Sequence, residues 1–301
     1  MNVHATKEAA AASMLMKADP NLPALIVTGT QSIAIRVGTT FDGHAFDVET
    51  PVLLPDTLFA GFDYVIAVDR MGVAMAVAIE VPPPDDSCLG GFHFAPGGNA
   101  GARAGGDDVP AINPFSLWDV NFRPSCPDPR GMALVEGPDG KFWCDIYLLG
   151  VSHLHDGTSR FGKTIADGRD PPENPAGGHF KKLDYDTACA VMKHHGKSLL
   201  STEEFARAAI GGTERTAREE DPEITGLDAP RTSRRGVMQA FGSMWVWGHD
   251  GDPDEPRASL FGGSWLDDGS AGSRYANVGN WPDDSNGNLG ARGRSDHLNL
   301  G

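Results

Sequence analysis

The stretch that decides the fold of the C-terminal half is Gly196-Lys-Ser-Leu-Leu-Ser-Thr-Glu-Glu-Phe-Ala-Arg-Ala-Ala209. Ser201 and Glu204 have the spacing of a capping box, in which each side chain accepts a hydrogen bond from the other residue's backbone N–H. Phe205, Ala208 and Ala209 form an apolar face, and Gly211-Gly212 can end the segment. We therefore predict a short amphipathic helix that begins after Ser201.

The sequence around this helix alternates between short structured segments and glycine. A second helix is predicted over Tyr185 to His195, because apolar side chains recur at helical spacing and Gly196 follows as a stop. A strand is predicted over Phe142 to Leu149. Further on, aromatic residues and glycines come in islands separated by polar residues. These islands are Ser243-Met-Trp-Val-Trp-Gly248, Phe261-Gly-Gly-Ser-Trp265, Gly272-Ser-Arg274 and Gly290-Ala-Arg-Gly293.

The N-terminal half consists of short β-type runs separated by turn residues, a spacing typical of an all-β sandwich. We predict this sandwich over residues 25–115, after an N-terminal segment (1–24) that contains a short helix over 5–17. The glycine-rich residues 97–106 are interpreted as a loop or linker, and a second domain spans 116–301. The predicted strands are 25–27, 33–37, 46–48, 64–68 and 73–81. The fold class is thus α+β and mostly β.

Composition excludes several classes of protein. The 301 residues carry 25 Lys+Arg against 41 Asp+Glu, a net charge of −16, and no lysine follows Lys197. Nucleic-acid binding requires clustered basic residues, so we exclude it. The longest near-continuous apolar run, 71–81, is far short of the ~20 residues that span a bilayer, so we expect no membrane-spanning segment. The four cysteines have no zinc-site spacing and are interpreted as buried free thiols, with a Cys126–Cys144 contact left open.

Metal and catalytic motifs are weak. Asp250-Gly-Asp-Pro-Asp-Glu255 places carboxylates at alternate positions, but lacks the glycine and glutamate of a calcium loop. A solvated acidic turn is the preferred interpretation, and structural Ca²⁺ is the alternative. His153 and His155 are expected on one face of a strand, without a third ligand nearby. The polar segments 165–180 and 213–235 are interpreted as mobile surface loops. No catalytic residue, metal site or required cofactor is predicted.

The C-terminal islands resemble the C-type lectin fold in the version shared by formylglycine-generating enzymes and the variable proteins of diversity-generating retroelements. The similarity is greatest to the phage receptor-binding proteins of that second group, and runs from about residue 25 to the C-terminus. Four further stretches carry it: Leu89-Gly-Gly-Phe-His-Phe-Ala-Pro-Gly-Gly-Asn-Ala100, Ser116-Leu-Trp-Asp-Val-Asn-Phe-Arg-Pro124, Asp128-Pro-Arg-Gly-Met132 and Asp145-Ile-Tyr-Leu-Leu-Gly-Val-Ser-His-Leu-His-Asp-Gly-Thr-Ser159. The resemblance implies that 116–301 is a C-type lectin-like domain.

The resemblance also implies a variable ligand-binding region over about 262–290. In such proteins, copying errors at adenines rewrite selected codons, and Asn, Asp, Ser, Gly and Leu are all reachable from an Asn codon by such changes. The implied variable residues are Ser264, Leu266, Asp267, Asp268, Ser270, Asn277, Gly279, Asn280, Asp284, Asn286, Asn288 and Leu289. Their side chains are expected to point to solvent, where replacement costs little stability. The implied scaffold residues are Trp265, Ser273, Arg274, Tyr275, Ala291 and Arg292.

The function that the resemblance implies is recognition of a host cell-surface receptor, a protein, by a homotrimer at the tip of a tail fibre on the virion. Trimerisation is less well supported than the fold, because residues 1–24 are too short for the N-terminal β-prism that such trimers use. Two alternatives remain. One is a host-encoded display protein with the same ligand-binding site. The other is an oxidase of the formylglycine-generating type, which needs reactive C-terminal cysteines, whereas all four cysteines here precede residue 190.

Overall fold

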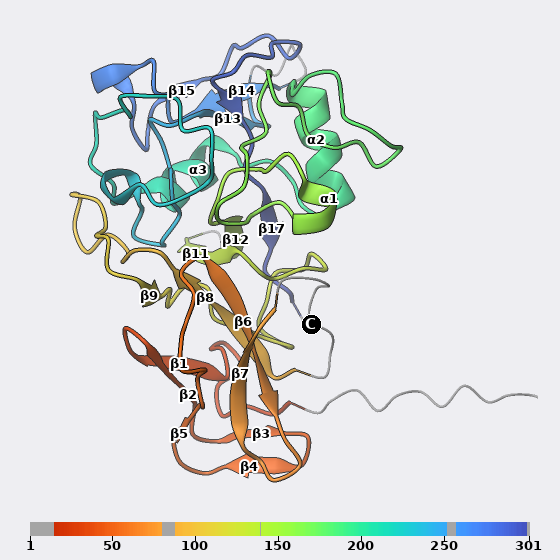
Figure 1. The fold of residues 1–301 in the computed structure, drawn as a ribbon, viewed down its shortest axis with the longest axis vertical. Helices are drawn as coiled ribbons and strands as arrows, with labels where there is room; N and C mark the ends of the chain where they lie inside the picture. The colour runs from red at the N-terminus through yellow and green to blue at the C-terminus, as the bar shows by residue number, and fades with distance from the viewer. Residues whose placement is uncertain (1–14, 80–87, 139, 252–256, 300–301) are drawn as a thin grey trace, which may run out of the picture.

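The computed structural model describes residues 15–79, 88–138, 140–251 and 257–299. The molecule is elongated, with the N-terminal strands at one end and the C-terminal helices and strands at the other (Figure 1). The helix predicted over residues 5–17 falls largely outside the described residues. Within them, Met16 forms a β-bridge with Thr40, so this part of the segment is extended and tied to the first domain.

Two β-sheets and a hairpin build the N-terminal domain. The first sheet has the order β1-β2-β5, the second has the order β10-β8-β6-β7 with β9 beside β8, and β3 pairs with β4. The strands are β1 (Leu25–Gly29), β2 (Ser32–Ile35), β3 (Thr39–Phe41), β4 (His44–Phe46), β5 (Thr50–Pro51), β6 (Phe62–Val68), β7 (Ala74–Ala78), β8 (Gly90–Ala95), β9 (Ala111–Ile112) and β10 (Trp118–Asp119).

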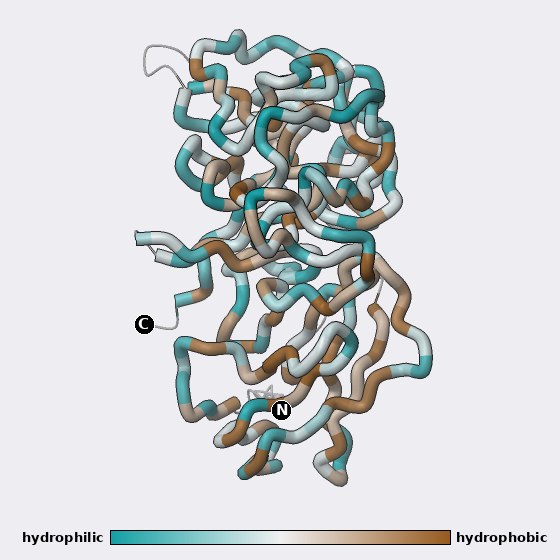
Figure 2. Tube along the Cα trace, turned by 90° about the vertical axis from the view of Figure 1, so that its left-hand side faces the viewer, coloured by the Kyte–Doolittle hydropathy of each residue, from teal (hydrophilic) through white to brown (hydrophobic). Residues whose placement is uncertain are grey.

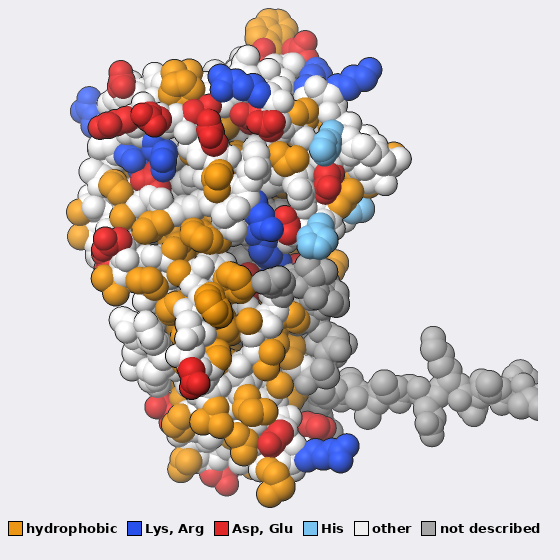
Figure 3. Space-filling model, in the orientation of Figure 1, with side chains coloured by type: hydrophobic (Ala, Val, Ile, Leu, Met, Phe, Trp, Pro, Cys, Tyr) orange, Lys and Arg blue, Asp and Glu red, His pale blue; other side chains and the backbone are white. Residues whose placement is uncertain are grey.

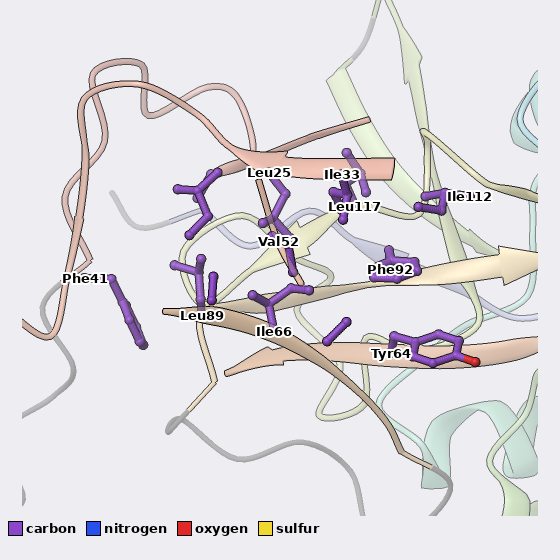
Figure 4. Close-up of a cluster of buried hydrophobic side chains, with 14 of the residues drawn as sticks. Leu25, Ile33, Phe41, Val52, Tyr64, Ile66, Leu89, Phe92, Ile112 and Leu117 are labelled. Atoms are coloured by element: carbon purple, nitrogen blue, oxygen red, sulfur yellow. The ribbon is translucent and has the colours of Figure 1, made fainter. Parts of the chain in front are cut away.

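The core of this domain lies between the two sheets. Side chains of β1 and β2, such as Leu25 and Ile33, point toward Tyr64 and Ile66 of β6 and Phe92 of β8 (Figure 4). Along β2, β6 and β8 the members of this core are two positions apart, as Tyr64 and Ile66 are, because every second side chain of a strand points to the same face. Two sheets packed in this way form the predicted sandwich, and each predicted strand overlaps an observed one.

The second sheet continues beyond the boundary predicted at residues 115/116. Trp118 pairs with Gly91 and Asp119 with Gly90, so β10 is an edge strand of the N-terminal sheet. Glycine is required here, because a Cβ at residue 90 would lie 2.1 Å from the Trp118 carbonyl oxygen. The sequence placed this boundary too early, since two-residue strands give almost no periodic signal.

Packing and hydrogen bonds join the two domains. Trp118 and Phe122 share a buried cluster with Trp143 of the C-terminal domain. The His93 ring lies 3.2 Å from the Asp63 carboxylate and 2.9 Å from the Tyr147 hydroxyl, so one buried imidazole bridges the domains. The sandwich and the C-terminal domain are therefore continuous in their cores.

Two further sheets and three helices build the C-terminal domain. One sheet has the order β11-β12-β17 and the other β15-β14-β13-β16. The strands are β11 (Met132–Gly137), β12 (Gly140–Asp145), β13 (Trp245–Gly248), β14 (Ser259–Phe261), β15 (Ala276–Asn277), β16 (Leu289–Gly290) and β17 (Arg294–Asp296). The helices are α1 (His153–Asp156), α2 (Tyr185–His194) and α3 (Thr202–Ala209), with 3₁₀ turns at Ala229–Arg231 and Asp268–Ser270.

Both predicted helices form where the sequence placed them. The Ser201 hydroxyl accepts from the Glu204 N–H at 3.2 Å, and the Glu204 carboxylate accepts from the Ser201 N–H at 2.9 Å, which is the predicted capping box. Phe205 is buried on the apolar face of α3. The strand expected to reach Leu149 ends earlier, at Asp145, because the following residues turn to bury Ile146 and Tyr147 in an irregular segment.

Three segments predicted as linker or mobile loops are bonded to the body of the molecule. In the glycine-rich segment 97–106, the Gly105 N–H donates to the Gly211 carbonyl and the Gly106 N–H to the Ala229 carbonyl, so this segment packs on the C-terminal domain instead of linking domains. In 213–235, Thr225 and Asp228 are buried. Segment 165–180 joins the fold through the Ile165–Gly150 bridge. Polar composition misled the prediction, because these polar groups bond inside the protein.

The distribution of hydropathy agrees with this architecture. Hydrophobic stretches of the trace occur in both halves, whereas the loops at the end that carries β15 contain much hydrophilic trace (Figure 2). None of the helices in the described part of the chain has the length and apolar character needed to cross a bilayer.

Candidate functional site

Ten of the twelve predicted variable residues lie on two loops that leave one small sheet, and the other two, Asn277 and Leu289, lie in its strands β15 and β16. β14 pairs antiparallel with both β13 and β15, while β16 runs parallel to β13, with Trp245 opposite Leu289. Residues 262–275 connect β14 to β15, and residues 278–288 connect β15 to β16. This sheet lies at the end of the molecule farthest from β3 and β4 (Figure 1). Both loops therefore belong to the outer end of the C-terminal domain, where a partner can approach them.

The exposure of the twelve predicted variable residues varies with position. The six exposed ones are Leu266, Asp268, Ser270, Asn277, Gly279 and Asn286. The four half-buried ones are Asp267, Asn280, Asp284 and Asn288. The remaining two, Ser264 and Leu289, are buried, so the prediction that all twelve point to solvent is wrong for these two.

Both buried positions have a local structural reason. The Ser264 hydroxyl donates to the Asp267 carboxylate at 2.7 Å and accepts from the Asn288 amide at 3.3 Å, so it links the two loops. Leu289 lies in β16 and packs in the cluster that contains Trp247. Replacement at either position changes the interior of the loops, not their outer surface.

Of the six predicted scaffold residues, three are buried: Ser273, Ala291 and Arg292. Trp265 and Tyr275 are half-buried, and the Tyr275 ring lies 4.9 Å from the Trp245 ring. Arg274 is exposed, so its prediction as a buried scaffold residue is wrong. Ser273 and Arg274 lie in a turn that the Tyr275 N–H closes on the Gly272 carbonyl at 3.1 Å, and within this turn the Arg274 side chain is exposed.

Arg292 connects three segments beneath the loops. Its Nη1 donates to the carbonyls of Asp145 and Ile146 at 2.8 and 2.7 Å, and its Nη2 donates to those of Met238 and Gln239 at 2.8 and 3.2 Å. The side chain is only 1% exposed. A guanidinium can satisfy several carbonyls at once because its donors form a fixed planar fork. Arg292 thereby ties the backbone just after β16, where the second loop ends, to the segments that follow β12 and precede β13.

A second support comes from segment 213–235. The Glu214 carboxylate accepts from the Ser273 N–H at 3.0 Å and from the Ser273 hydroxyl. Gly272 leaves room for this carboxylate, because a Cβ there would lie 2.5 Å from Glu214 Oε2. Glu214 therefore fixes the first loop. No pattern in the sequence predicts this role of Glu214, because a glutamate in a polar segment is normally solvated.

A third support holds the second loop from the side. The Gly168 N–H donates to the Asn286 carbonyl at 3.1 Å, and the Leu183 N–H donates to the Ser285 hydroxyl at 3.0 Å. The Tyr185 N–H donates to the Pro282 carbonyl at 3.0 Å. The loop backbone is thus bonded to fixed segments that precede α2, while most of its predicted variable side chains stay accessible.

An open hollow lies between the two loops. Its lining includes Arg169, Trp265, Leu266, Asn286 and Asn288. The Arg169 guanidinium also pairs with Asp221 at 2.9 Å. Amide groups, an aliphatic side chain and a guanidinium in a hollow suit hydrogen bonding and apolar contact with a ligand.

The cysteines do not form reactive or bridged sites. All four are free thiols, so Cys126 and Cys144 do not form a disulfide. Burial raises the pKa of Cys126 and raises that of Cys144 to about 12. Burial likewise raises the pKa of Cys189. Thiolates, the nucleophilic form, are disfavoured at all three positions.

The histidines form a packed pair. His153 and His155 lie in helix α1, not on a strand, because Ser152 to Gly157 make a single helical turn. His153 Nδ1 is 2.8 Å from His195 Nε2, and His153 Nε2 is 2.7 Å from the Glu173 carbonyl. Burial lowers the pKa of both rings, with that of His195 at about 3. Both are therefore neutral at neutral pH and serve packing.

No group of three or more His, Cys, Asp or Glu side chains is placed to hold a metal ion within the described residues. The acidic turn considered for calcium lies partly outside them, since 252–256 are not described. Its first carboxylate, Asp250, accepts from the Thr202 N–H at 2.8 Å and so supports the start of α3. This hydrogen bond gives Asp250 a structural role.

Comparison with known proteins identifies the family of this scaffold. No protein-family model matches the chain. The sequence is 38% identical to the tail fiber receptor-binding protein of Bordetella phage BPP-1 over 327 aligned positions, which cover 95% of this chain and 85% of that protein. The chain belongs to the major tropism determinant family of phage receptor-binding proteins.

Solved structures of major tropism determinant variants have the same fold. The I1 variant matches with a TM-score of 0.86 and 38% identity, covering 95% of this chain and 86% of that one. The P3c variant matches with a TM-score of 0.87 and 38% identity over the same shares of both chains. The predicted fold class, mostly β with a C-type lectin-like domain, is confirmed. These major tropism determinant relatives are receptor-binding proteins, not enzymes.

Proposed function

We propose that this chain is a receptor-binding protein at the tip of a phage or prophage tail fibre, and that its two outer loops contact a protein on the host cell surface. One observation carries the proposal. Exposed side chains at predicted variable positions stand on a backbone fixed from outside the loops by Arg292, Glu214 and Gly168. Such a surface can change its ligand without changing its fold, because surface replacements usually cost less than ~0.5 kcal/mol.

We also propose that the protein acts as a homotrimer on the virion. Support comes from the apolar surface of the N-terminal domain, where hydrophobic side chains gather (Figure 3). Met75 and Val77 of β7 are 38% and 51% exposed on the outer face of the sheet, and Leu53 beside them is 58% exposed. A solvated sheet face is normally polar, so an apolar one suits contact with other copies. Several sites on one particle would then act together and raise avidity.

The proposal includes no catalytic step, cofactor or metal ion. The oxidase alternative needs a reactive thiolate, whereas burial raises the pKa values of Cys126, Cys144 and Cys189. The host-encoded alternative uses the same loops for binding. It differs in location, and immunoblotting of purified phage particles distinguishes the two, because only a tail-fibre protein copurifies with the particles.

Capture of host envelopes tests the proposed surface. We expect the immobilised protein to retain envelope vesicles from at least one strain of a bacterial panel. Replacing Asn277, Asn280 and Asn286 together by alanine should lower that capture at least about tenfold, since a few central residues dominate most interfaces. The matched control replaces Asn21, Asp47 and Glu49, three exposed residues of the N-terminal domain, by alanine and should leave capture unchanged.

Thermal unfolding must show the same midpoint for the wild type and both variants, so that a loss of capture reports contact and not unfolding. Equal capture by the loop variant and the wild type would contradict the assignment of the surface. A loss in the N-terminal control alone would move the binding surface to the other domain.

A further inference from the structure

We infer that Trp281 is a fixed aromatic anchor of this surface, against which an apolar part of the receptor polypeptide packs. The inference rests on the proposed function and names a residue outside the twelve predicted variable positions. Trp281 lies in the loop between β15 and β16 and is 68% exposed. Trp281 lies between the predicted variable residues Asn280 and Asp284. An exposed indole at such a position is poorly explained by folding alone, because tryptophan is highly buried on average.

The backbone that carries Trp281 is held in place. Its carbonyl accepts from the Asp284 N–H at 3.2 Å and from the Asn280 side-chain amide at 3.1 Å. The next residue, Pro282, accepts from the Tyr185 N–H at 3.0 Å. Proline also restricts the backbone of the residue before it. Trp281 is thus presented from a constrained loop.

This constraint reaches the core of the domain in two steps. Ser285 accepts from the Leu183 N–H at 3.0 Å, and the Leu183 carbonyl accepts from Trp247 Nε1 at 3.3 Å. Both Leu183 and Trp247 are fully buried. The Asn280 amide is the one supporting group that belongs to a predicted variable side chain. The other groups are backbone atoms, the Ser285 hydroxyl or residues outside 262–290, so exchange of the variable side chains leaves most of these bonds in place. A pre-organised anchor loses little conformational freedom when it binds.

The chemistry around Trp281 favours a polypeptide ligand. Leu266 and Val278, in the same two loops, are 59% and 49% exposed. These aliphatic side chains have no hydrogen-bonding groups to offer to the hydroxyls of a glycan, whereas they gain from burial against apolar protein surface. Tryptophan is moreover among the residues most enriched at the energetic centres of protein–protein interfaces. We therefore assign the anchor to a protein receptor.

Substitution of the anchor tests the inference on the strain whose envelope vesicles the wild-type protein captures best. Trp281→Ala should reduce capture at least about tenfold, whereas Trp281→Phe, which retains an aromatic ring, should stay within about threefold of the wild type. Met71→Ala is the control, because Met71 is 84% exposed on the N-terminal domain. All four proteins should unfold at the same temperature. Treating the vesicles with protease should abolish capture, and treating them with periodate should not.

The outcomes separate the anchor from the function itself. If the wild type captures vesicles and Trp281→Ala captures them equally well, the anchor is overturned while the proposed function stands. If capture is lost after periodate and survives protease, the ligand is a glycan and the assignment to a polypeptide is overturned. If the wild type captures vesicles from no strain, the proposed function fails and the anchor fails with it.

Discussion

Replacing Arg292 with methionine is expected to destabilise the protein by about 3 kcal/mol or more, because four buried backbone carbonyls lose a charged donor at once. Each unsatisfied buried polar group costs about 1–3 kcal/mol. Methionine fills much of the space but donates no hydrogen bond. Denaturant-induced unfolding measures the effect as a lower midpoint at unchanged slope.

Arg274→Met is the matched control for this experiment. Arg274 was predicted as scaffold on the same grounds as Arg292, yet it is exposed, so its replacement should change the free energy of unfolding by less than ~0.5 kcal/mol. Arg292→Lys keeps the charge without the planar fork and should fall between wild type and Arg292→Met. Equal stability of the Arg292→Met variant and the wild type would remove Arg292 from the scaffold.

Replacing Lys197 with methionine is the second change with a large expected effect, about 3–5 kcal/mol of lost stability, because it leaves a buried carboxylate without its counter-ion. Lys197 Nζ lies 2.6 Å from Asp145 Oδ1, and their side chains are 4% and 0% exposed. Burial acts to lower the pKa of Lys197, but the adjacent Asp145 carboxylate raises it above the ordinary value. Lys197 is thus protonated in the folded protein at neutral pH.

An exposed ion pair provides the comparison. Lys182 Nζ lies 2.8 Å from Asp184, but its side chain is 45% exposed, so Lys182→Met should cost less than ~1 kcal/mol. The double variant Lys197→Met/Asp145→Asn should be more stable than Lys197→Met alone, because it removes the stranded charge. A Lys197→Met variant no less stable than Lys182→Met would show that the buried pair does not hold the segment after α2 to the end of β12.

The sequence predicted those parts of the fold whose signal is local. The capping box at Ser201 placed α3, and short β-type runs bounded by turn residues placed β1 and β6. Partners far apart in the chain gave no such signal. Glu214 approaches Ser273 across 59 positions, and Gly168 approaches Asn286 across more than a hundred, so both segments looked like free polar loops.

The candidate site was predictable as a region but not residue by residue. The resemblance placed the variable positions within 262–290, and the structure has ten of the twelve on two loops and the other two, Asn277 and Leu289, in strands. Whether a small polar residue faces water or the interior depends on its partners, which is why Ser264 was misplaced while Asn277 was not. The sequence does not single out Trp281, because tryptophan is highly buried on average, and only the structure gives its exposure.

The central claim is that the loops change their ligand while the fold stays the same. The most direct test replaces the six exposed predicted variable side chains together and measures both thermal unfolding and capture across the envelope panel. We predict that the unfolding midpoint stays within a few degrees of the wild type, since surface changes cost little, while the set of captured strains changes. An unfolded variant, or a folded variant that captures the same strains with the same strength, would contradict the account.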